Sequence, residues 1–413
     1  MKILPRSEFF GEFAVPGDKS ITHRAVMLNA AAEGEALITG ALTGEDCLST
    51  VSCMRALGAK IERDGDRIRV VGAPAFADGQ TLYCGNSGTT MRLLAGLLAG
   101  RNVRAVLTGD PSLSKRPMER VAAPLRLLGA EVRTQSGFAP VEIGPAALKG
   151  CAIQTEVASA QVKSAVILAA LGAEGETAVS EKLKTRDHTE RMLGAMGAQI
   201  ELDGNTVRVR KSRLHAADVA VPADISSAAY FMVLGALLGE TLVRNVGINP
   251  TRTGIFTVFD RMGVSYALEG ERTVCGEPVA DVRVKKSALR PLRLKREDMP
   301  SLIDEIPVIA VLCAFADGES VISGAEELRV KESDRIATTA EMLAAVGASV
   351  TAKEDGFVIR GKKKIAGADV DPRLDHRIAM SAAVALCASE RGGEIKDAAC
   401  ADISFPNFYS LLG

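Results

Sequence analysis

The chain has 413 residues, of which 47% are hydrophobic and 24% are charged, and its formal net charge is −1. This length predicts two domains, and the balanced charge argues against a dedicated nucleic-acid-binding protein. No apolar run approaches the ~18 residues of a membrane helix, and the first residues lack a secretory signal. The eight cysteines are scattered without zinc-type spacing, which predicts reduced thiols, no metal site and a cytoplasmic location.

One sequence pattern recurs six times along the chain. It consists of a turn that is usually Gly-Glu, a short apolar strand, a polar stretch and a helix that ends near Leu-Gly-Ala. Alternating strand pairs follow most of the closing glycines, and turns such as Asp64-Gly65 and Asp203-Gly204 predict hairpins there. The closing glycine fits the residue after a helix, where glycine tolerates a positive φ. The six copies of this pattern run from Gly34 to Gly58, Gly100 to Gly129, Gly175 to Gly197, Gly239 to Gly263, Gly318 to Gly347 and Gly393 to Gly413.

A second helix, rich in alanine, precedes each opening glycine and begins with small polar or charged residues. Because these helices are apolar nearly all round, they are predicted to be buried. Each unit is therefore expected to contain a helix, a strand, a helix and two further strands. The buried helices are expected to begin near Lys19, Ser87, Ser159, Ser226, Asp304 and Asp375.

The sixth unit stops at residue 413, before the strand pair that is due next. Residues 2–4 and 8–15 form a strand pair without a preceding helix, and we expect this N-terminal hairpin to complete the sixth unit. Domain sizes favour two domains of three units each. The expected domains are residues 1–14 plus 224–413, and residues 15–223. Two crossings of the chain around a cleft are typical of a hinge that closes on a ligand.

The first buried helix begins in a stretch suited to anions. Residues 16–24 read Pro-Gly-Asp-Lys-Ser-Ile-Thr-His-Arg, in which Lys19 and Arg24 add charge and Ser20 adds a hydroxyl. A helix N-terminus also offers free N–H groups and a partial positive charge. A simple N-cap at Asp18 or Ser20 beside a solvated lysine is equally consistent with these residues. The spacing does not match that of a nucleotide P-loop.

Other helix starts show related patterns. Residues 85–92, 114–118 and 159–161 place small residues, hydroxyls or cations before or at a helix, although ordinary turn and capping roles explain each of them alone. If residues 328–335 are helical, Lys331 and Arg335 share one face and Glu332 pairs with Arg335, but such a run is usually a surface charge ladder.

Two further helix starts carry carboxylates. Asp304 and Glu305 precede an apolar helix, and residues 375–377 read Asp-His-Arg. A partly buried aspartate at a helix start is a candidate for a shifted pKa, although the carboxylates also suit the helix dipole. Together, the helix starts of both halves favour a cleft that closes on a ligand with two or more anionic groups.

These stretches, in this order, resemble the 5-enolpyruvylshikimate-3-phosphate synthase family over essentially the whole chain. The resemblance rests on residues 16–24, 85–92, 114–118, 331–335 and 375–377, and residues 157–164, 185–191 and 276–281 are similar to the bacterial class II branch. It implies the enolpyruvyl transferase fold, a two-domain inside-out α/β barrel with six βαβαββ units, three per domain, and an active site in the interdomain cleft.

The resemblance also implies the reaction: phosphoenolpyruvate and shikimate 3-phosphate give an enolpyruvyl ether and phosphate, on the route to chorismate. It implies no metal or organic cofactor, no nucleic-acid or membrane partner, and a monomer. Asp304 would accept the hydroxyl proton, and Glu332 and Lys19 would move protons at the methylene carbon. Shikimate 3-phosphate would be bound by Lys19, Ser20, Arg24, Ser159, Ala160 through its backbone, Gln161, Arg186, Asp304 and Lys331. Phosphoenolpyruvate would be bound by Lys19, Gly88, Arg116, Gln161, Arg335 and Arg377.

Two positions depart from the family pattern. Many members have a second serine where this chain has Ala160, and many have a lysine before the Phe-Pro pair, where this chain has Ser404. One cationic contact to phosphoenolpyruvate is therefore absent or supplied by another residue. Gly88 stands where a larger residue would crowd phosphoenolpyruvate and its competitor glyphosate.

Two other functions compete with this interpretation. The sister enzyme UDP-N-acetylglucosamine enolpyruvyl transferase shares the fold and the donor, but it typically carries a cysteine in the loop before Arg-Pro, and residues 111–115 contain none. A non-catalytic anion-binding repeat protein is the other alternative. Asp304 and Glu332 argue against it, because carboxylates add nothing to the binding of anions alone.

Overall fold

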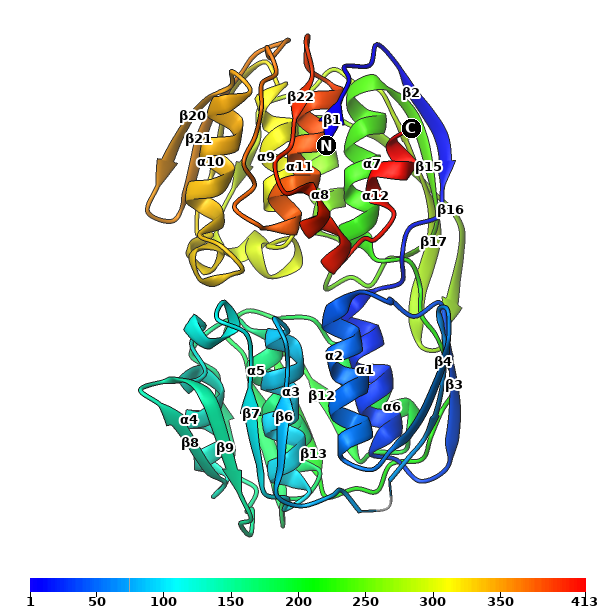
Figure 1. Ribbon diagram of the computed structural model, residues 1–413, viewed down its shortest axis with the longest axis vertical. Helices are drawn as coiled ribbons and strands as arrows, with labels where there is room; N and C mark the ends of the chain where they lie inside the picture. Colours follow the sequence, from blue (N-terminus) through cyan, green and yellow to red (C-terminus); the bar gives the residue numbers. More distant parts are fainter. Residues whose placement is uncertain (74) are drawn as a thin grey trace. The chain divides into compact units, whose positions relative to one another are not determined.

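The computed structural model describes residues 1–73 and 75–413, and the chain divides into two compact units (Figure 1). Unit 1 consists of Met1–Pro16, Pro222–Thr273 and Pro278–Gly413, and unit 2 consists of Gly17–Val221 and Val274–Glu277.

The division lies two residues from the expected boundaries, after residue 16 instead of 14 and after residue 221 instead of 223. The short segment Val274–Glu277 differs from the expectation of a contiguous domain, because its contacts lie in unit 2. Glu277 Oε1 lies 2.8 Å from His188 Nδ1, and Arg191 Nη1 donates to the carbonyl of Gly276 over 3.1 Å.

Unit 2 contains three repeats, each with a four-stranded sheet. In every sheet the first strand runs parallel to the second, the second pairs antiparallel with the fourth, and the third lies at the edge. The first repeat takes its first strand from the end of the unit: it comprises β14 (Val219–Ala220), α1 (Lys19–Ala30), β3 (Glu35–Thr39), α2 (Glu45–Ala56), β4 (Lys60–Asp64) and β5 (Arg67–Val71).

The other two repeats of unit 2 follow in chain order. The second comprises β6 (Gln80–Tyr83), α3 (Gly88–Gly100), β7 (Ala105–Thr108), the 3-10 helix η1 (Leu113–Lys115), α4 (Glu119–Leu127), β8 (Glu131–Gln135) and β9 (Phe138–Gly144). The third comprises β10 (Ala152–Gln154), α5 (Ala160–Ala170), β11 (Glu176–Ser180), α6 (His188–Ala195), β12 (Ile200–Asp203) and β13 (Thr206–Arg210).

Unit 1 repeats the same order, with the sheets β2-β15-β17-β16 and β18-β19-β21-β20. The fourth repeat comprises β2 (Phe9–Phe13), α7 (Ile225–Leu238), β15 (Gly239–Gly247), α8 (Gly254–Met262), β16 (Ser265–Val274) and β17 (Glu277–Lys285). The fifth comprises β18 (Arg293–Leu294), η2 (Arg296–Ser301), α9 (Ile306–Ala314), β19 (Gly318–Ile322), η3 (Glu326–Val330), α10 (Arg335–Ala345), β20 (Ser349–Lys353) and β21 (Gly356–Gly361).

The sixth repeat is abbreviated to a two-stranded sheet within the described residues. It comprises β1 (Lys2–Ile3), α11 (His376–Cys387), β22 (Gly393–Glu394), η4 (Ala398–Ile403) and α12 (Phe408–Leu412). The α/β architecture of six repeats, three in each unit, confirms the expected fold class.

The N-terminal strands do not act as one hairpin, so the expectation that both complete the sixth repeat is wrong for the second strand. β1 pairs antiparallel with β22, whereas β2 pairs in parallel with β15 of the fourth repeat. The fourth repeat needs a parallel first strand and an apolar cover for α7. The rings of Phe9 and Phe13 provide that cover, with centroids 6.4 and 4.5 Å from the ring of Phe231.

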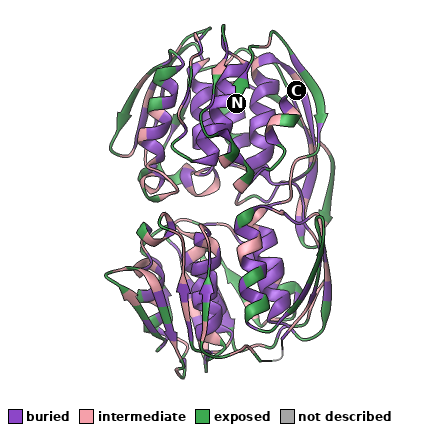
Figure 2. Ribbon diagram, viewed as in Figure 1, coloured by how far each residue is buried: buried purple, intermediate pink, exposed green. Residues whose placement is uncertain are grey.

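The first helix of each repeat lies in the interior of its unit. α3, α5, α7, α9 and α11 are buried along almost their whole length, whereas strands such as β4 and β12 expose most of their residues, as Figure 2 shows. α3 and α5 pack so closely that a Cβ on Gly96 would stand 2.0 Å from the carbonyl oxygen of Ala165. Buried helices with sheets outside them are the arrangement that the apolar, alanine-rich pattern predicted.

Candidate active site

The N-terminal ends of α1 and α3 are held together in unit 2 by a chain of buried hydroxyls. His23 Nδ1 lies 2.6 Å from Thr50 Oγ1, which lies 2.7 Å from Thr90 Oγ1. α5 joins them through Gln161, whose Nε2 donates to Thr89 Oγ1 over 2.9 Å. Three helix N-termini therefore meet, and their partial positive charges add up at one place.

Arg24 is the central cation of this region and is 3% exposed. Its Nε donates to Thr189 Oγ1 over 2.6 Å, its Nη2 to Ser164 Oγ over 2.8 Å and its Nη1 to the carbonyl of Ser20 over 3.0 Å. Burial lowers the pKa of Arg24 to about 10, so the guanidinium is charged at neutral pH. A buried arginine that binds neutral oxygen atoms keeps its charge available to an anion.

The start of α1 contains one residue that caps the helix, Asp18, and two that can contact a ligand, Lys19 and Ser20. Asp18 caps the helix, since its Oδ1 accepts a hydrogen bond of 2.9 Å from the N–H of Ile21. Lys19 is not solvated, because its side chain is only 16% exposed and its Nζ lies 3.1 Å from Asp46 Oδ2. Capping by Asp18 thus leaves Lys19 and Ser20 in the first turn, where both can contact a ligand. No motif near residue 46 indicated that Asp46 would contact Lys19.

Two more arginines flank the start of α3. Arg92 Nη1 donates to Gln161 Oε1 over 2.6 Å, and Arg116 Nη2 donates to Asn86 Oδ1 over 2.5 Å. A Cβ on Gly88 would lie 3.0 Å from Arg92 Nη1 and 3.5 Å from Arg116 Nη1. Gly88 therefore leaves room in front of two guanidinium groups. Arg92 belongs to the motif of residues 85–92, but no role was predicted for it. Its i+4 spacing from Gly88 could have indicated that the two residues share one face of α3.

Ser159 and Ala160 lie at the start of α5 and are half-buried. Within residues 1–73 and 75–413 the hydroxyl of Ser159 caps no backbone amide of the helix, so a plain capping role does not explain this residue. Arg186 lies close enough to Arg24 for its charge to contribute to the lowered pKa of that arginine. We call these residues the unit 2 cluster: Lys19, Ser20, Arg24, Gly88, Arg92, Arg116, Ser159, Ala160, Gln161 and Arg186.

Unit 1 places a carboxylate among cations at the start of α9. Asp304 Oδ1 lies 3.5 Å from Lys331 Nζ and 3.8 Å from Arg335 Nη1. Asp304 Oδ2 lies 3.9 Å from both Arg252 Nη1 and Arg377 Nη2. Four positive groups around one carboxylate attract it and hold it in place. We call these five residues, together with Glu332 and Asp375, the unit 1 cluster.

Arg335 links this carboxylate to a second one. Its Nε and Nη2 donate to the two oxygens of Asp375 over 2.8 and 3.2 Å, and Glu332 Oε2 lies 2.6 Å from its Nη2. Burial lowers the pKa of Arg335, but Asp375 and Glu332 outweigh burial and raise the pKa above its ordinary value. Arg335 is therefore a fixed, permanently charged group.

Residues 331–334 are not helical, so the condition under which Lys331 and Arg335 would share one helix face is not met. The 3-10 helix η3 ends at Val330 and α10 begins at Arg335. Asp334 Oδ1 accepts hydrogen bonds from the N–H groups of Ile336 and Ala337, which fixes the helix start at that point. The pair of Glu332 and Arg335 forms nevertheless, across the cap instead of along a helix.

Lys331 and Arg377 respond differently to burial. Burial lowers the pKa of Lys331 below the ordinary lysine value, and the nearby charge of Asp304 does not offset this effect. Arg377 donates from Nη1 to the carbonyl of Asp304 over 2.9 Å, and its pKa is raised despite burial because of the charge of Asp304. Lys331 is thus the cation of this cluster that can lose its proton at alkaline pH.

Arg252 is a site residue that the sequence analysis missed. It is 3% exposed, its Nη2 donates to Ser226 Oγ over 2.7 Å, and the same atom lies 3.3 Å from Asp224 Oδ1. Ser226 and Asp224 mark the start of α7, so the N-terminal ends of α7 and α9 meet at this arginine. In the sequence Arg252 stands just before α8 without any flanking motif, and only the fold brings it to Asp304.

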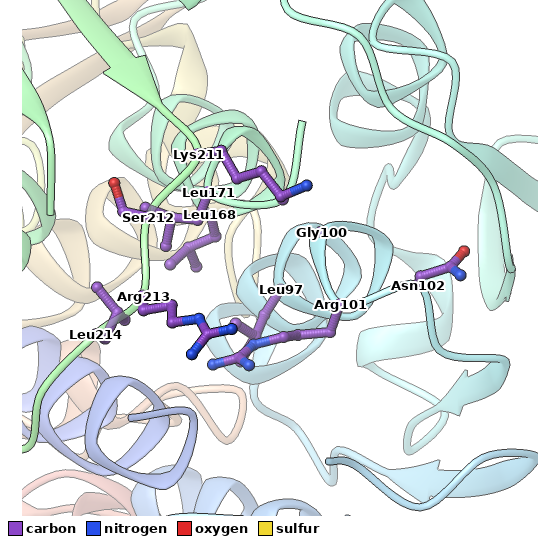
Figure 3. Close-up of a pocket in the computed structure, with 11 residues that line it drawn as sticks. Leu97, Gly100, Arg101, Asn102, Leu168, Leu171, Lys211, Ser212, Arg213 and Leu214 are labelled. Carbon is purple, nitrogen blue, oxygen red and sulfur yellow. The ribbon is translucent and has the colours of Figure 1, made fainter. Parts of the chain in front are cut away.

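The other end of the unit 2 helices is also basic, but its cations have structural partners. Arg101 Nη2 donates to the carbonyl of Ala31, Lys211 pairs with Glu174, and Arg213 Nη1 lies 3.6 Å from Glu33 Oε1. Cations stabilise the carbonyl ends of helices. Figure 3 shows the cavity of about 540 Å³ at this end, which is lined by Leu97, Gly100, Arg101, Asn102, Leu168, Leu171, Gly172, Lys211, Ser212, Arg213 and Leu214.

Three further features bear on the expectations. All eight cysteines are free thiols. Among the described residues, no group of three or more histidine, cysteine or carboxylate side chains is arranged to hold a metal ion. None of the helices that the structure describes has the length and apolar character needed to cross a membrane.

The repeated fold and the two clusters define a class of protein: an α/β protein whose buried helices carry arginines, lysines and carboxylates at their N-terminal ends, an arrangement suited to anionic small molecules. Residues 4–412 match the family model of EPSP synthase (3-phosphoshikimate 1-carboxyvinyltransferase). The chain belongs to this family, and it is a transferase of carboxyvinyl, or enolpyruvyl, groups.

Full-length relatives support this membership. The chain is 49% identical to a 3-phosphoshikimate 1-carboxyvinyltransferase of Gloeobacter violaceus, with 99% of this chain and 97% of the relative covered. It is 48% identical to a 3-phosphoshikimate 1-carboxyvinyltransferase of Desulforudis audaxviator, with 100% of this chain and 98% of the relative covered. These descriptions favour 3-phosphoshikimate as the acceptor over the acceptor of the sister enzyme.

Solved structures show the same fold. An EPSP synthase of Acinetobacter baumannii aligns with a TM-score of 0.88 at 44% identity and covers 99% of this chain and 96% of its own. The enolpyruvyl transferase NikO of Streptomyces tendae aligns with a TM-score of 0.81 at 20% identity, with coverages of 100% and 96%. NikO is too distant to indicate more than the fold, which is the enolpyruvyl transferase fold that the resemblance implied.

Proposed function

We propose that this protein transfers the enolpyruvyl group of phosphoenolpyruvate to the 5-hydroxyl of shikimate 3-phosphate, and that each cluster has a separate task in this reaction. Unit 2 supplies most of the groups that hold the anions, and unit 1 supplies the carboxylates that move protons. The observation that carries this division is the contrast between Arg24, which binds hydroxyl oxygens, and Asp304, which lies among four cations.

The substrate contacts follow the family resemblance and the two clusters. Arg24 is the main ligand of shikimate 3-phosphate, because a buried guanidinium with neutral partners binds a dianion strongly. The same substrate is held by Lys19, Ser20, Ser159, Ala160 through its backbone, Gln161, Arg186, Asp304 and Lys331. Phosphoenolpyruvate is held by Lys19, Gly88 through its backbone, Arg116, Gln161, Arg335 and Arg377.

The reaction needs three proton transfers, two in the addition step and one in the elimination step. The 5-hydroxyl oxygen attacks C2 of phosphoenolpyruvate while Asp304 takes the hydroxyl proton, and the methylene carbon gains a proton from Lys19 or Glu332. The resulting tetrahedral adduct then loses a proton from its methyl group and expels inorganic phosphate, which restores the vinyl group. Positioned cations stabilise the charge at each step, and no covalent enzyme intermediate is required.

The cations around Asp304 explain how one carboxylate can serve first as an anchor and then as a base. Arg335 and Arg377 stabilise its charged form before substrates bind. When the same arginines bind the anionic groups of phosphoenolpyruvate, part of their positive charge is offset. Asp304 then becomes a better proton acceptor at the stage where the reaction needs one.

The remaining expectations concern where the enzyme works and in what form. We propose that it acts in the cytoplasm, because eight free thiols are typical of a reducing compartment. We also propose that it acts as a monomer, because one chain carries both clusters. Sedimentation of the purified protein at several concentrations tests this second statement.

The decisive experiment for the function is an assay of phosphate release from phosphoenolpyruvate with each partner omitted in turn. Release only in the presence of shikimate 3-phosphate, with one enolpyruvyl ether formed for each phosphate, is the expected result. Release with UDP-N-acetylglucosamine instead would assign the protein to the sister activity. Binding of both anions without any release would make it a non-catalytic binding protein.

A further inference from the structure

A buried ion cluster behind Arg24 has no role in the reaction as described above. Lys163 is 1% exposed, and its Nζ lies 2.8 Å from Glu181 Oε2 and 2.7 Å from Glu190 Oε1. Burial lowers the pKa of this lysine, but the charges of Glu190 and Glu181 outweigh burial and raise the pKa above the ordinary value. A charged lysine and two carboxylates are costly to bury, so their presence in the interior suggests that they position other groups.

The three residues lie directly behind the groups that bind Arg24. Lys163 is followed on α5 by Ser164, and Glu190 follows Thr189 on α6. The hydroxyls of Ser164 and Thr189 accept the hydrogen bonds of Arg24 Nη2 and Nε. By joining α5 to α6, the ion pair of Lys163 and Glu190 sets the distance between the two hydroxyls that orient the guanidinium.

The cluster also holds the loop that carries Arg186. Lys163 Nζ donates to the carbonyl of Thr185 over 3.3 Å, and the N–H of Thr185 donates to Glu181 Oε2 over 3.2 Å. The hydroxyl of Thr185 donates to the other oxygen of Glu181. Thr185 is thus held on three sides, and Arg186 is the next residue in the chain.

The positive charges of Arg24 and Arg186 are also partly balanced in this region. Lys163, Glu181 and Glu190 together carry one net negative charge, and Arg24 and Arg186 lie beside them. The carboxylate of Glu190 is the largest favourable charge acting on Arg24, while Arg186 acts against it. Without this negative group, the buried Arg24 and the half-buried Arg186 would repel each other in the absence of substrate.

We infer that Lys163, with Glu181 and Glu190, is a positioning residue that orients Arg24 and Arg186 for the phosphate of the acceptor substrate. It acts through these arginines and does not touch the substrate. The inference rests on the proposed assignment of both arginines to shikimate 3-phosphate. Of the proposed ligands of phosphoenolpyruvate, only Gln161 shares α5 with Lys163, whereas Gly88 and Arg116 lie on other elements. We therefore expect the binding of phosphoenolpyruvate to depend much less on this cluster.

The test is a comparison of steady-state constants for Lys163→Met, which keeps the length of the side chain and removes its charge. We expect the KM for shikimate 3-phosphate to rise about tenfold or more, since misplaced ligands of a phosphate lose charge-assisted hydrogen bonds. The KM for phosphoenolpyruvate should change less than about twofold. Lys163→Arg, which restores the charge, should recover most of the affinity for shikimate 3-phosphate.

A milder variant covers the case in which Lys163→Met does not fold. Thr185→Val removes one hydroxyl, keeps the backbone contact with Lys163, and should raise the same KM several-fold. The matched control is Asn29→Leu, which removes a buried hydrogen-bonding side chain at the far end of α1. This control should lower the melting temperature and leave both KM values unchanged.

Arg24→Ala separates the two possible failures. If this variant raises the KM for shikimate 3-phosphate and neither Lys163→Met nor Thr185→Val does, the positioning role is wrong and the site assignment stands. If Arg24→Ala also leaves that KM unchanged, the assignment of the substrate is wrong. Equal increases in both KM values for Lys163→Met and for Asn29→Leu would reduce Lys163 to a residue that only stabilises the fold.

Discussion

The two clusters use arginine in different ways. In unit 2, Arg24, Arg92 and Arg116 donate to hydroxyl and amide oxygens. In unit 1, Arg335 and Arg377 face the carboxylates of Asp375 and Asp304. Hydroxyl and amide oxygens orient a guanidinium without neutralising it, whereas carboxylates neutralise it and are themselves held in the charged form.

This difference explains why one fold, repeated in both halves, can divide binding from chemistry. The same element, a buried helix with its N-terminus at the site, carries Lys19 and Ser20 in one unit and follows Asp304 in the other. A helix N-terminus favours anions in either case. Whether that anion is a substrate or the enzyme's own carboxylate depends on the few residues before and after the helix start.

The largest expected effect comes from the carboxylate of unit 1. Asp304→Ala should lower kcat by about 10²-fold or more, the usual contribution of a general base, while the KM for shikimate 3-phosphate changes much less. Steady-state kinetics of the purified variant measures both constants. Glu319→Ala, an exposed carboxylate on β19 of the same unit, is the control and should keep normal kinetics. Near-normal turnover of Asp304→Ala would remove Asp304 from the mechanism.

The next effect comes from the central arginine of unit 2. Arg24→Lys keeps the positive charge but loses the fork that binds Thr189 and Ser164 together. The KM for shikimate 3-phosphate should rise by about 10- to 100-fold, and kcat should fall less. The same substitution at the exposed Arg69 should have no effect. An unchanged KM for Arg24→Lys would mean that charge alone matters here, and that the hydroxyl partners do not.

A smaller effect is expected at Gly88, where the two arginines next to α3 limit the space. A methyl group there would lie 3.0 Å from Arg92 Nη1 and would displace that guanidinium by a few tenths of an ångström. Gly88→Ala should therefore weaken inhibition by glyphosate about tenfold and raise the KM for phosphoenolpyruvate less than that. Inhibition assays at fixed phosphoenolpyruvate provide the measurement. Gly194→Ala, where the nearest atom is 3.9 Å from the added Cβ, should leave inhibition unchanged.

The smallest effect concerns pH. Burial lowers the pKa of Lys331, so its charge is present below that pKa and is lost as the pH rises through it. The alkaline limb of kcat/KM should accordingly lie below the ordinary lysine range, and Lys331→Arg should move the limb to higher pH because arginine keeps its proton. A pH profile of both proteins tests this. Lys353→Arg on the exposed strand β20 is the control, and an identical shift in that variant would contradict the assignment.

Much of this structure could be predicted because the same residue types recur at corresponding positions of the repeats. The closing glycines Gly58, Gly129 and Gly197 all have positive φ values, of 104°, 91° and 84°, as the residue after a helix requires. Alanine-rich helices without a polar face could only be interior helices. Such local rules depend on a few neighbouring residues, and a sequence shows those directly.

The features that could not be predicted depend on contacts between residues far apart in the sequence. Nothing near Phe9 indicates that β2 joins β15 instead of β1, because the choice depends on the ring of Phe231. Only the fold brings Arg252 into the unit 1 cluster and Asp46 to the side chain of Lys19. Residues 328–335 do not form the continuous helix that their charge spacing would allow, because Asp334 caps a helix that begins at Arg335.

The division of labour between the clusters can be measured directly by calorimetric titration of shikimate 3-phosphate into the wild-type protein, Arg24→Ala and Asp304→Ala. We expect Arg24→Ala to lose most of the affinity, and Asp304→Ala to bind nearly as well as the wild type although it no longer turns over. Full affinity in Arg24→Ala together with lost binding in Asp304→Ala would contradict it.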